Sequence, residues 1–460
     1  MSERILTVGN MARDDIIAEH LGGAVLNVMA GHLHPGLVEK VNKTGGLFYQ
    51  TTNMKNGEVA AAFAQDVDAT LAIVTGDNQL AARVVDALQV ANPGLLIAAP
   101  NRASFKPEAD KLETRLINEK ISKQLNHDFN PFYIVANNPA EVEEAAAEFE
   151  RRGWSMVVKP RAPADGRGVQ VMGKQGHFQT YSAGAKYAKD VLKLPGQPGV
   201  LFEEELLGPE FNLQGWTDGL NLLAPPVTVD YPYRLDGDQG PGTGGMGSFN
   251  FAPGELPGFL KPEDYQLAML YTRCFLQEMR DRGLDFKGVI YPNFKLTKDG
   301  IKSIENNLRP GDPEWMNIVT SLEARLDHVE QYKRIATGQF QPEKIGWTGL
   351  ASTVIYGVAP TYAFETRKFK PHYFILNPDI LTYFGVKAYF SAAERVTENM
   401  FATVSQSRAV ALVAAGDKPW EARARILEAI MARGMTGELE YRLQIGEEAY
   451  IESLQDPRAA

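Results

Sequence analysis

The segment that most constrains this chain is a short turn followed by a polar strand. The turn TKDG, at 297–300, stands between FKGVIYPNFKL and IKSIENNLRPGDPE, so the sequence predicts a β-hairpin. Residues two apart on a strand point to one face, which would place Glu305, Asn307 and Arg309 together. A carboxylate, a carboxamide oxygen and a guanidinium suit Mg²⁺ and the phosphate oxygens that it bridges. The hairpin therefore indicates a site for a magnesium nucleotide, with Glu305 and Asn307 as metal ligands.

The composition excludes several other classes of protein. A chain of 460 residues exceeds what one hydrophobic core usually organises, so we expect about three domains. The formal net charge of −10 argues against a nucleic-acid partner, because a phosphate backbone is bound by an excess of Lys and Arg. Cys274 is the single cysteine, and no apolar run approaches the ~20 residues of a membrane span. We expect a cytoplasmic monomer or homodimer that binds small molecules and neither nucleic acid nor membrane.

The order of apolar runs predicts parts with different architectures. Up to about residue 100, short β-rich runs alternate with amphipathic stretches, which is typical of a parallel sheet with crossover helices. Helices are expected at 107–125 and 139–152, each starting with proline. From about residue 154 the pattern changes to hairpins, which indicates antiparallel sheet.

Later segments complete this prediction. Residues 236–258 are too rich in Gly and Pro for a regular element, and 317–336 reads as one helix. The domains expected are an α/β substrate-binding domain at 1–105, a central domain at 106–335 with a lid subdomain at about 154–206, and a C-terminal domain at 336–460.

A glycine loop, PRAPADGRGV at 160–169, lies between two predicted strands. It returns as a strand rather than a helix, which excludes a P-loop or a dinucleotide fingerprint. Glycine lets backbone N–H groups approach a phosphate, although an ordinary turn is the commoner explanation of such a loop on its own. Lys159, just before it, suits phosphate oxygens unless it is simply solvated.

Two further segments are candidate nucleotide contacts. VLFEEEL, at 200–206, ends an apolar strand with three carboxylates, and strand geometry separates Glu204 from Glu203 and Glu205. It is either a polar strand edge or a backbone hinge for adenine. GPGTGGMG, at 240–247, could line an anion pocket with successive N–H groups, because flexible linkers are usually longer and Ser-rich.

Other catalytic chemistry finds no support in the sequence. The seven histidines show no metal-binding spacing, and a GxSxG nucleophile elbow is absent. Zinc hydrolase chemistry and a serine nucleophile are therefore not expected.

Taken in order, these segments resemble the ATP-grasp ligases, and most closely the phosphoribosylamine–glycine ligase (glycinamide ribonucleotide synthetase) family. VVKPRAPADGRGV is similar to the family's VVKADGLAAGKGV, and FEEELLGPEF to its EEFLDGEE. DQGPGTGGMGSFNFAP is similar to DTGPNTGGMGAYSPAP, and SIENNLRPGDPE to EFNxRxGDPE. ADKLETR stands near the family's SK segment. The similarity runs thinly over nearly the whole chain, and the last two of the four paired motifs are the specific ones.

The resemblance implies an α/β and α+β fold: a Rossmann-like N-terminal domain, an ATP-grasp core and a small C-terminal domain. It implies ATP and Mg²⁺ (or Mn²⁺) as cofactors. Arg309, Asp312 and Lys159 would be catalytic. The nucleotide contacts would be Lys111, Lys159, Gly166, Arg167, Gly168, Glu203, Glu204, Glu210, Gly244, Gly245 and Gly247.

The implied reaction needs no protein nucleophile. A carboxylate attacks the γ-phosphate of ATP to give an acyl phosphate, and an amine then displaces phosphate to leave an amide. Catalysis would consist of alignment and charge neutralisation in a closed site, with the glycine loops as a lid against water. In the phosphoribosylamine–glycine ligase family this is a step of purine biosynthesis.

The substrate side departs from the family pattern. GxGGREH is replaced by GNMARDD, QDHKR by VDYPY, and Asp77 stands where GPEAPL has a glutamate. These losses weaken phosphate recognition unless Arg13, Arg161 or Arg234 compensates. The candidate substrate contacts are Gly9, Arg13, Asp77 and Asp230, while Asp15 and His32 are either pocket or surface residues.

Three functions stay open at this point. The first is a divergent phosphoribosylamine–glycine ligase, and the second is a sister ligase that joins a different amino acid or amine. The third, a nucleotide-binding pseudoenzyme, is disfavoured because Glu305, Asn307 and Arg309 are kept together.

Overall fold

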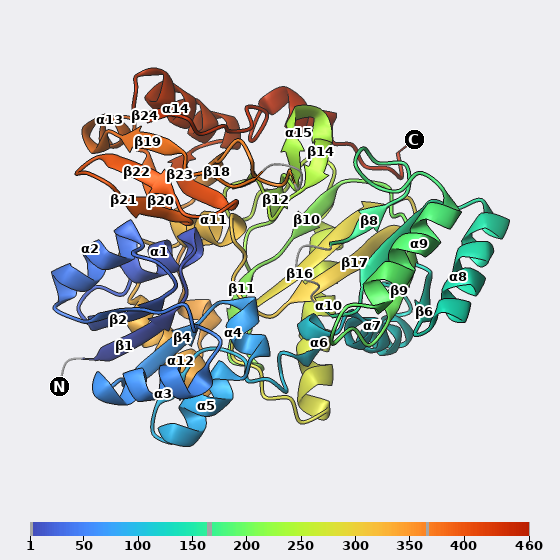
Figure 1. The fold of residues 1–460 in the computed structure, drawn as a ribbon, viewed down its shortest axis with the longest axis horizontal. Helices are drawn as coiled ribbons and strands as arrows, with labels where there is room; N and C mark the ends of the chain where they lie inside the picture. Colours follow the sequence, from blue (N-terminus) through green and yellow to red (C-terminus); the bar gives the residue numbers. More distant parts are fainter. Residues whose placement is uncertain (1–2, 163–167, 365–367, 460) are drawn as a thin grey trace.

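The computed structural model describes residues 3–162, 168–364 and 368–459, which form the expected mixture of α/β and α+β architecture (Figure 1). The N-terminal part is a five-stranded parallel sheet in the order β3-β2-β1-β4-β5. Its strands are β1 (Arg4–Val8), β2 (Val25–Ala30), β3 (Phe48–Gln50), β4 (Leu71–Val74) and β5 (Leu96–Ile97). Its helices are α1 (Ala12–Glu19), α2 (Pro35–Thr44), α3 (Gly57–Asp66), α4 (Asp77–Ala81) and α5 (Val84–Ala91). Because ligands of such sheets bind at the carboxyl ends of the strands, the loops after β1 and β4 are the ones that face a site.

A small antiparallel sheet in the order β6-β9-β7-β8 forms the lid part. Its strands are β6 (Tyr133–Ala136), β7 (Met156–Pro160), β8 (Gln170–Val171) and β9 (Val200–Glu204), and α8 (Pro139–Arg152) and α9 (Tyr181–Leu192) pack on it. Local signals set the bounds of α8: Asn138 accepts hydrogen bonds from two backbone N–H groups, and Gly153 ends the helix with φ 67°. The buried apolar side chains of this part form a core of their own, and its helices and strands are drawn in teal and green in Figure 1.

The largest sheet has nine strands and runs through the middle of the molecule. Its order is β11-β16-β10-β12-β15-β18-β23-β20, and β17 pairs with β16. The central strands are β10 (Glu210–Asn212), β11 (Gly215–Thr217), β12 (Thr228–Asp230), β15 (Gly247–Asn250), β16 (Gly288–Thr297) and β17 (Gly300–Asn307). The C-terminal strands are β18 (Ala351–Val358), β20 (Lys387–Phe390) and β23 (Arg408–Gly416). The sheet therefore contains strands from both sides of residue 336.

The prediction that 236–258 contains no regular element is wrong. A short helix η1 (Asp236–Asp238) follows β13 (Tyr233–Leu235), and β14 (Gln239–Gly242) pairs with β13. β15 is paired on both sides, with β12 and with β18. A Cβ at Gly247 would lie 2.2 Å from the carbonyl oxygen of Val354, so glycine here serves close strand packing.

The helices around the large sheet include one further correction. They are α6 (Lys106–Ala109), α7 (Lys111–Leu125), α10 (Pro262–Asp281), α11 (Glu314–Ser321) and α12 (His328–Thr337). The single helix expected at 317–336 is thus two helices. Leu322 is extended and bridges to Trp347, and Asp327 accepts a hydrogen bond from the backbone N–H of Glu330 to start α12.

The last part of the chain adds a second four-stranded sheet, in the order β21-β22-β19-β24. Its strands are β19 (Tyr373–Leu376), β21 (Ala393–Arg395), β22 (Met400–Thr403) and β24 (Met435–Gly437). The helices here are η2 (Pro342–Lys344), α13 (Pro378–Tyr383), α14 (Pro419–Met431) and α15 (Glu448–Ser453).

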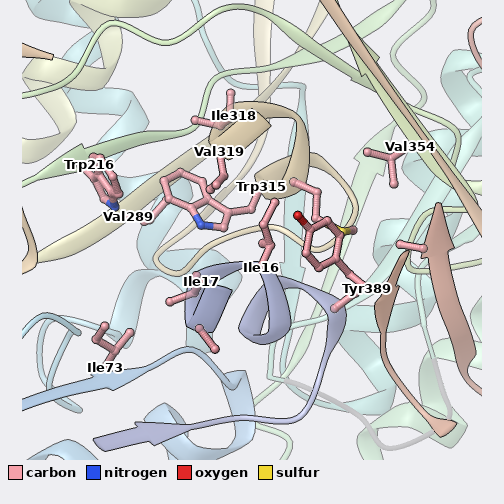
Figure 2. Packing of buried hydrophobic residues seen from close by; sticks show 14 of the residues in the cluster. Ile16, Ile17, Ile73, Trp216, Val289, Trp315, Ile318, Val319, Val354 and Tyr389 are labelled. Carbon is pink, nitrogen blue, oxygen red and sulfur yellow. The ribbon is translucent and has the colours of Figure 1, made fainter. Parts of the chain in front are cut away.

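The main hydrophobic core joins the N-terminal part to the large sheet. Trp315 of α11 is fully buried beside Ile16 and Ile17 of α1, and Tyr389 of β20 closes the same cluster (Figure 2). The indole ring of Trp216 lies 5.7 Å from that of Trp315, centroid to centroid. This packing fixes the loops of the N-terminal sheet against the β16–β17 hairpin. Among the described residues, no helix has the length and apolar character needed to cross a membrane.

Candidate active site

Three cavities meet at the β16–β17 hairpin, with volumes of about 500, 550 and 670 Å³. The first lies between the N-terminal loops and the hairpin, and the second between the N-terminal part and α6–α7. The third, the largest, lies between the lid sheet and the nine-stranded sheet. Ile304 and Glu305 line all three, so the hairpin stands at the centre of the site.

β17 carries a bulge immediately before Glu305. The register runs from Asn293 opposite Glu305 to Phe294 opposite Ser303, which leaves Ile304 as the extra residue. A bulge re-aims the side chains next to it, and Ile304 and Glu305 both face cavities as a result.

The predicted strand geometry holds for two of the three hairpin residues. Asn307 lies two residues beyond Glu305 on the strand and lines the first two cavities with it. β17 ends at Asn307, so Arg309 reaches the same two cavities from the following loop and not from the strand, contrary to the expectation.

Glu305 and Asn307 fit the donor set of a magnesium nucleotide. Nδ2 of Asn307 donates a hydrogen bond to Oε1 of Glu305 at 3.1 Å, which holds the two side chains together. No three His, Cys, Asp or Glu side chains gather into a metal cage within the part of the chain that the structure describes. Mg²⁺ commonly takes one or two protein carboxylates and completes its shell with phosphate and water oxygens. The residues therefore suit a metal that arrives with a nucleotide.

Arg309 is enclosed by two carboxylates. Its Nε lies 3.1 Å from Oδ1 of Asp77 and 3.2 Å from Oε1 of Glu108. Burial disfavours the cation, but Asp77 and Glu108 outweigh it and raise the pKa of Arg309. A second cation, Arg13, has its Nη2 3.4 Å from the same oxygen of Asp77. A buried, permanently charged guanidinium thus stands beside Glu305.

The two acids around Arg309 differ in charge. Desolvation raises the pKa of Asp77, but Arg309 and Arg13 outweigh it and hold the pKa at about 2. Burial raises the pKa of Glu108 to about 7 in spite of Arg309, with a further contribution from Asp77. Glu108 therefore exchanges its proton near neutral pH.

Asp312 is held in place from the C-terminal part. The carbonyl oxygens of Asp312 and Gly245 accept hydrogen bonds from Nη1 of Arg408, at 2.5 and 3.2 Å, and that of Gly244 accepts a third. The hydroxyl of Tyr356 donates to the carboxylate of Asp312. Arg408, on β23, therefore fixes the glycine loop against the loop after β17.

An acidic pair lines the first cavity near Asp312. Burial and then the charge of Glu314 raise the pKa of Asp230 well above its usual value, and burial also raises the pKa of Glu314. The hydroxyl of Tyr291 donates to Glu314. The charge of one carboxylate therefore favours the protonated form of the other. Oδ1 of Asp230 is buried and makes no hydrogen bond with the described residues.

Lys159 and Glu203 lie on adjacent lid strands and form one buried cluster with Arg115 of α7. Oε2 of Glu203 lies 2.6 Å from Nζ of Lys159, and Oε1 lies 2.7 Å from Nε of Arg115. Burial would raise the pKa of Glu203, but the two cations hold it at about 2. All three side chains line the third cavity.

Three more predicted nucleotide contacts lie on cavity walls. Lys111 lines the second cavity, and Glu204 and Glu210 line the third. Glu204 also accepts a hydrogen bond from the backbone N–H of Phe132 at 2.9 Å, and Glu210 pairs with Lys295 at 2.8 Å.

The predicted glycines divide between cavity and framework. Gly244 lines the first cavity. Gly245 is buried, and a Cβ there would lie 2.5 Å from Pro313. Gly247 is part of β15, as described above. Gly168 is exposed, with its carbonyl accepting a hydrogen bond from Tyr187, whereas Gly166 and Arg167 fall outside the described residues.

On the substrate side, one of the three candidate compensating arginines reaches a cavity. Arg161 pairs with Asp110 and Arg234 with Glu440, both at 2.6 Å. Arg13 lines the first cavity, and its buried Nε makes no hydrogen bond with the described residues.

Three other residues of the N-terminal part, Gly9, Asp15 and His32, hold the structure together and do not face a substrate. The carboxylate of Asp14 occupies the place that a Cβ on Gly9 would take. Asp15 pairs with Lys40 at 2.6 Å and accepts from the backbone N–H of Phe390. His32 bonds to the carbonyl of Ser391. Asp15 and His32 therefore join the N-terminal part to β20 and its end.

Sequence reasoning missed Glu108, Arg115 and Arg408 as parts of the site. Arg115 alone had a local signal, because it lies four residues after Lys111 and so shares its helix face. Glu108 and Arg408 reach the site only through tertiary packing.

The chain is similar to known proteins over most of its length. The family described as "Phosphoribosylglycinamide synthetase, ATP-grasp (A) domain" matches residues 120–315. The phosphoribosylamine–glycine ligase of Thermococcus gammatolerans is 32% identical over 98% of this chain and 96% of its own length. That of Methanothermobacter thermautotrophicus is 30% identical over 98% and 97%.

Two solved structures show the same fold. The phosphoribosylamine–glycine ligase of Thermotoga maritima superposes with a TM-score of 0.73 at 20% identity, over 96% of this chain and 99% of that one. The biotin carboxylase domain of Hydrogenobacter thermophilus 2-oxoglutarate carboxylase, a complex with MgADP and bicarbonate, superposes with a TM-score of 0.72 at 15% identity. It covers 100% of this chain and 97% of that one.

Proposed function

This chain belongs to the phosphoribosylamine–glycine ligase family, and we propose that it joins the amine of phosphoribosylamine to the carboxyl group of glycine. ATP is converted to ADP and phosphate, and glycinamide ribonucleotide, a precursor of purines, is the product. One observation carries the proposal: Glu305, Asn307 and Arg309 lie together where the first two cavities meet. They supply the carboxylate, the carboxamide oxygen and the cation that suit a magnesium nucleotide.

The nucleotide would lie in the third cavity, between the lid sheet and the nine-stranded sheet. Lys159 and Lys111 would neutralise phosphate oxygens, and Glu204 and Glu210 would contact the adenosine. Glu305 and Asn307 would hold Mg²⁺, which supplies charge neutralisation across the phosphates. Arg309 would stabilise the phosphoryl group in flight, because its guanidinium is buried and already oriented by Asp77 and Glu108.

The amine and the acid would meet in the first cavity. Arg13 and Arg309 supply cations on its N-terminal side, and Asp230 supplies a carboxyl group with a raised pKa on the opposite wall. Arg13 would contact the phosphate of the amine substrate, in place of the cations that VDYPY lacks. Arg408 would keep the glycine loop and Asp312 in register with that cavity.

We propose the following division of labour along the chain. Residues 1–105 bind the amine, residues 106–335 bind the nucleotide with the lid at about 154–206, and residues 336–460 brace the glycine loop. The substrates are small molecules, and the protein acts as a monomer or homodimer.

The test is ADP formation by the purified protein with ATP, Mg²⁺, glycine and freshly generated phosphoribosylamine, each omitted in turn. The proposal expects ADP only in the complete mixture, together with glycinamide ribonucleotide detected by mass spectrometry. Other amino acids in place of glycine, and other amines in place of phosphoribosylamine, complete the design. Faster turnover with a different pair would replace this substrate assignment, and ADP release without any acceptor would overturn the ligase assignment.

A further inference from the structure

Arg115 occupies a position between the two halves of the nucleotide site. It comes from α7 and is almost fully buried, with 2% of its side chain exposed. Nε and Nη2 fork onto the two carboxylate oxygens of Glu203 at 2.7 and 3.0 Å. The fork is rigid because a planar guanidinium matches a carboxylate in two parallel hydrogen bonds.

The other side of the same guanidinium holds the hairpin. Nη1 donates to the carbonyl oxygen of Ser303 at 2.8 Å, and Nη2 donates to that of Ile304 at 2.7 Å. These two carbonyls belong to the bulge that directly precedes Glu305. A bulge leaves a backbone group outside the strand ladder, and here Arg115 supplies the missing partner.

We propose that Arg115 is a positioning residue that fixes the β17 bulge and so sets the direction in which Glu305 presents its carboxylate to a magnesium nucleotide. The inference rests on the proposed function, since it assigns Arg115 a role toward the proposed metal ligand. Arg115 touches neither nucleotide nor metal in this role. Its effect passes through two backbone carbonyls.

The same contacts join the lid sheet to the hairpin. Glu203 is shared between Arg115 and Lys159, whose ammonium faces the third cavity. If a nucleotide phosphate draws Lys159 away from Glu203, Arg115 remains the main partner of Glu203. Arg115 then still holds the bulge in place. Lysine at position 115 lacks the planar fork and cannot hold the carboxylate and both carbonyls in the same geometry.

The test compares Arg115→Lys with Arg282→Lys, a control that alters another arginine bound to α7. Arg282 contacts Glu113 of α7 from the end of α10, and within the described part of the chain its ion pairs are with Glu113 and Glu278, not with β17. Binding of Mn²⁺ in the presence of saturating ADP is followed by electron paramagnetic resonance, with thermal melting as a check of folding. We expect the half-saturating Mn²⁺ concentration to rise on the order of tenfold in Arg115→Lys, as for other groups that orient a metal ligand, and to stay unchanged in Arg282→Lys.

A double variant separates positioning from a general loss of stability. In a Glu305→Ala background, Arg115→Lys should produce no further loss of Mn²⁺ binding, because the group that Arg115 orients is gone. Glu203→Gln, which loosens the fork but keeps its shape, should shift the Mn²⁺ midpoint in the same direction by less, and it serves if Arg115→Lys does not fold.

The outcomes are distinguishable from those of the proposed function. Wild-type Mn²⁺ affinity in folded Arg115→Lys, or in folded Glu203→Gln, overturns the positioning role while the ligase assignment stands. An equal further loss in the Glu305→Ala background also overturns it. If the wild-type protein binds no Mn²⁺ with ADP, the proposed function itself falls, and this role falls with it.

Discussion

Glu203 and Glu108 are both buried beside the hairpin, with 2% and 11% of their side chains exposed, yet they carry opposite charge preferences. Burial by itself would raise the pKa of both side chains. Glu203 has Arg115 and Lys159 to itself at 2.7 and 2.6 Å, and its pKa stays at about 2. Glu108 shares Arg309 with Asp77, and its pKa rises to about 7.

Which acid of this site is charged therefore depends more on the number of cations per carboxylate than on burial. The Glu203 cluster is a fixed ion network that ties the lid to the hairpin. In the Arg309 cluster two cations, Arg309 and Arg13, face the carboxyl groups of Asp77, Glu108 and Glu305, so the cluster has the character of a site prepared for a further cation, such as the Mg²⁺ that accompanies a nucleotide.

The largest effect is expected from removing Arg309, the cation that Asp77 and Glu108 share. Arg309→Ala should lower kcat for ADP release by at least ~1000-fold, because a buried guanidinium that neutralises a transferring phosphoryl group has effects of that size. The measurement is steady-state ADP release, with thermal melting to show that the protein is folded. Glu305→Ala should be similarly inactive. Wild-type-like ADP release by either variant would remove the hairpin from the mechanism.

The Glu203 cluster, which has two cations for one carboxylate, should affect the free energy of unfolding. Glu203→Ala leaves Arg115 and Lys159 buried without their carboxylate, and breaking a buried pair in this way costs about 3–5 kcal/mol of unfolding free energy. Urea denaturation measures this loss. Glu205→Ala is the matched control, because Glu205 has only a 3.7 Å pair with the half-exposed Lys174 and should lose under about 1 kcal/mol. Equal losses in the two variants would contradict the cluster's role.

The free energy of unfolding should depend on pH through Glu108. The pKa of Glu108 is about 7 in the folded protein against 4.5 for an ordinary glutamate, so the folded state binds the proton more tightly. The stabilisation from that proton is complete below pH 4.5 and is lost as the pH rises toward and through 7, by about 3 kcal/mol in all. Urea denaturation of the nucleotide-free protein from pH 4.5 to 8 should show a decline that includes this contribution, and Glu108→Gln should make the decline smaller by that amount. An unchanged slope in Glu108→Gln would mean that another group is responsible.

The smallest effect on stability is expected at Glu148, which has a low pKa but lies at the surface. Hydrogen bonds from Arg151 and Arg152 on the surface of α8 lower the pKa of Glu148 to about 2, as for Glu203. Water screens this site, so Glu148→Gln should leave the melting temperature within experimental error of the wild type. A loss as large as that of Glu203→Ala would show that the low pKa, rather than burial, governs stability.

The sequence predicts what is local and misses what depends on distant pairing. α8 matches the expectation at both ends because Pro139 and the Asn138 cap define its start and Gly153 its end. β15 was missed because its glycines signal a loop, whereas its strand partners, β12 and β18, lie about 20 and 100 residues away. The hairpin was found because its turn and its strand pattern are local, and the proposal of Glu305 and Asn307 as metal ligands rests on the same local spacing.

Arg408 and Glu108 could not be predicted as site residues for the same reason. Arg408 is an isolated arginine in an apolar strand, and only the pairing of β18 with β23 carries it to Asp312. Glu108 looks like a solvated residue at a helix start until the N-terminal sheet places Asp77 and Arg309 beside it. Such charge clusters arise from three or more chain segments, so no window of sequence contains them.

β18 pairs with β15 over four residues, and this limits how the polypeptide can be shortened. A fragment ending at Thr337 would retain the proposed metal ligands Glu305 and Asn307 but would leave β15 with an unpaired edge of N–H and C=O groups, a template for joining to another molecule. Such a fragment is expected to self-associate. An autonomous unit therefore has to include β18, and expression libraries or labelling schemes that split the chain before residue 351 will cut through the middle of its central sheet.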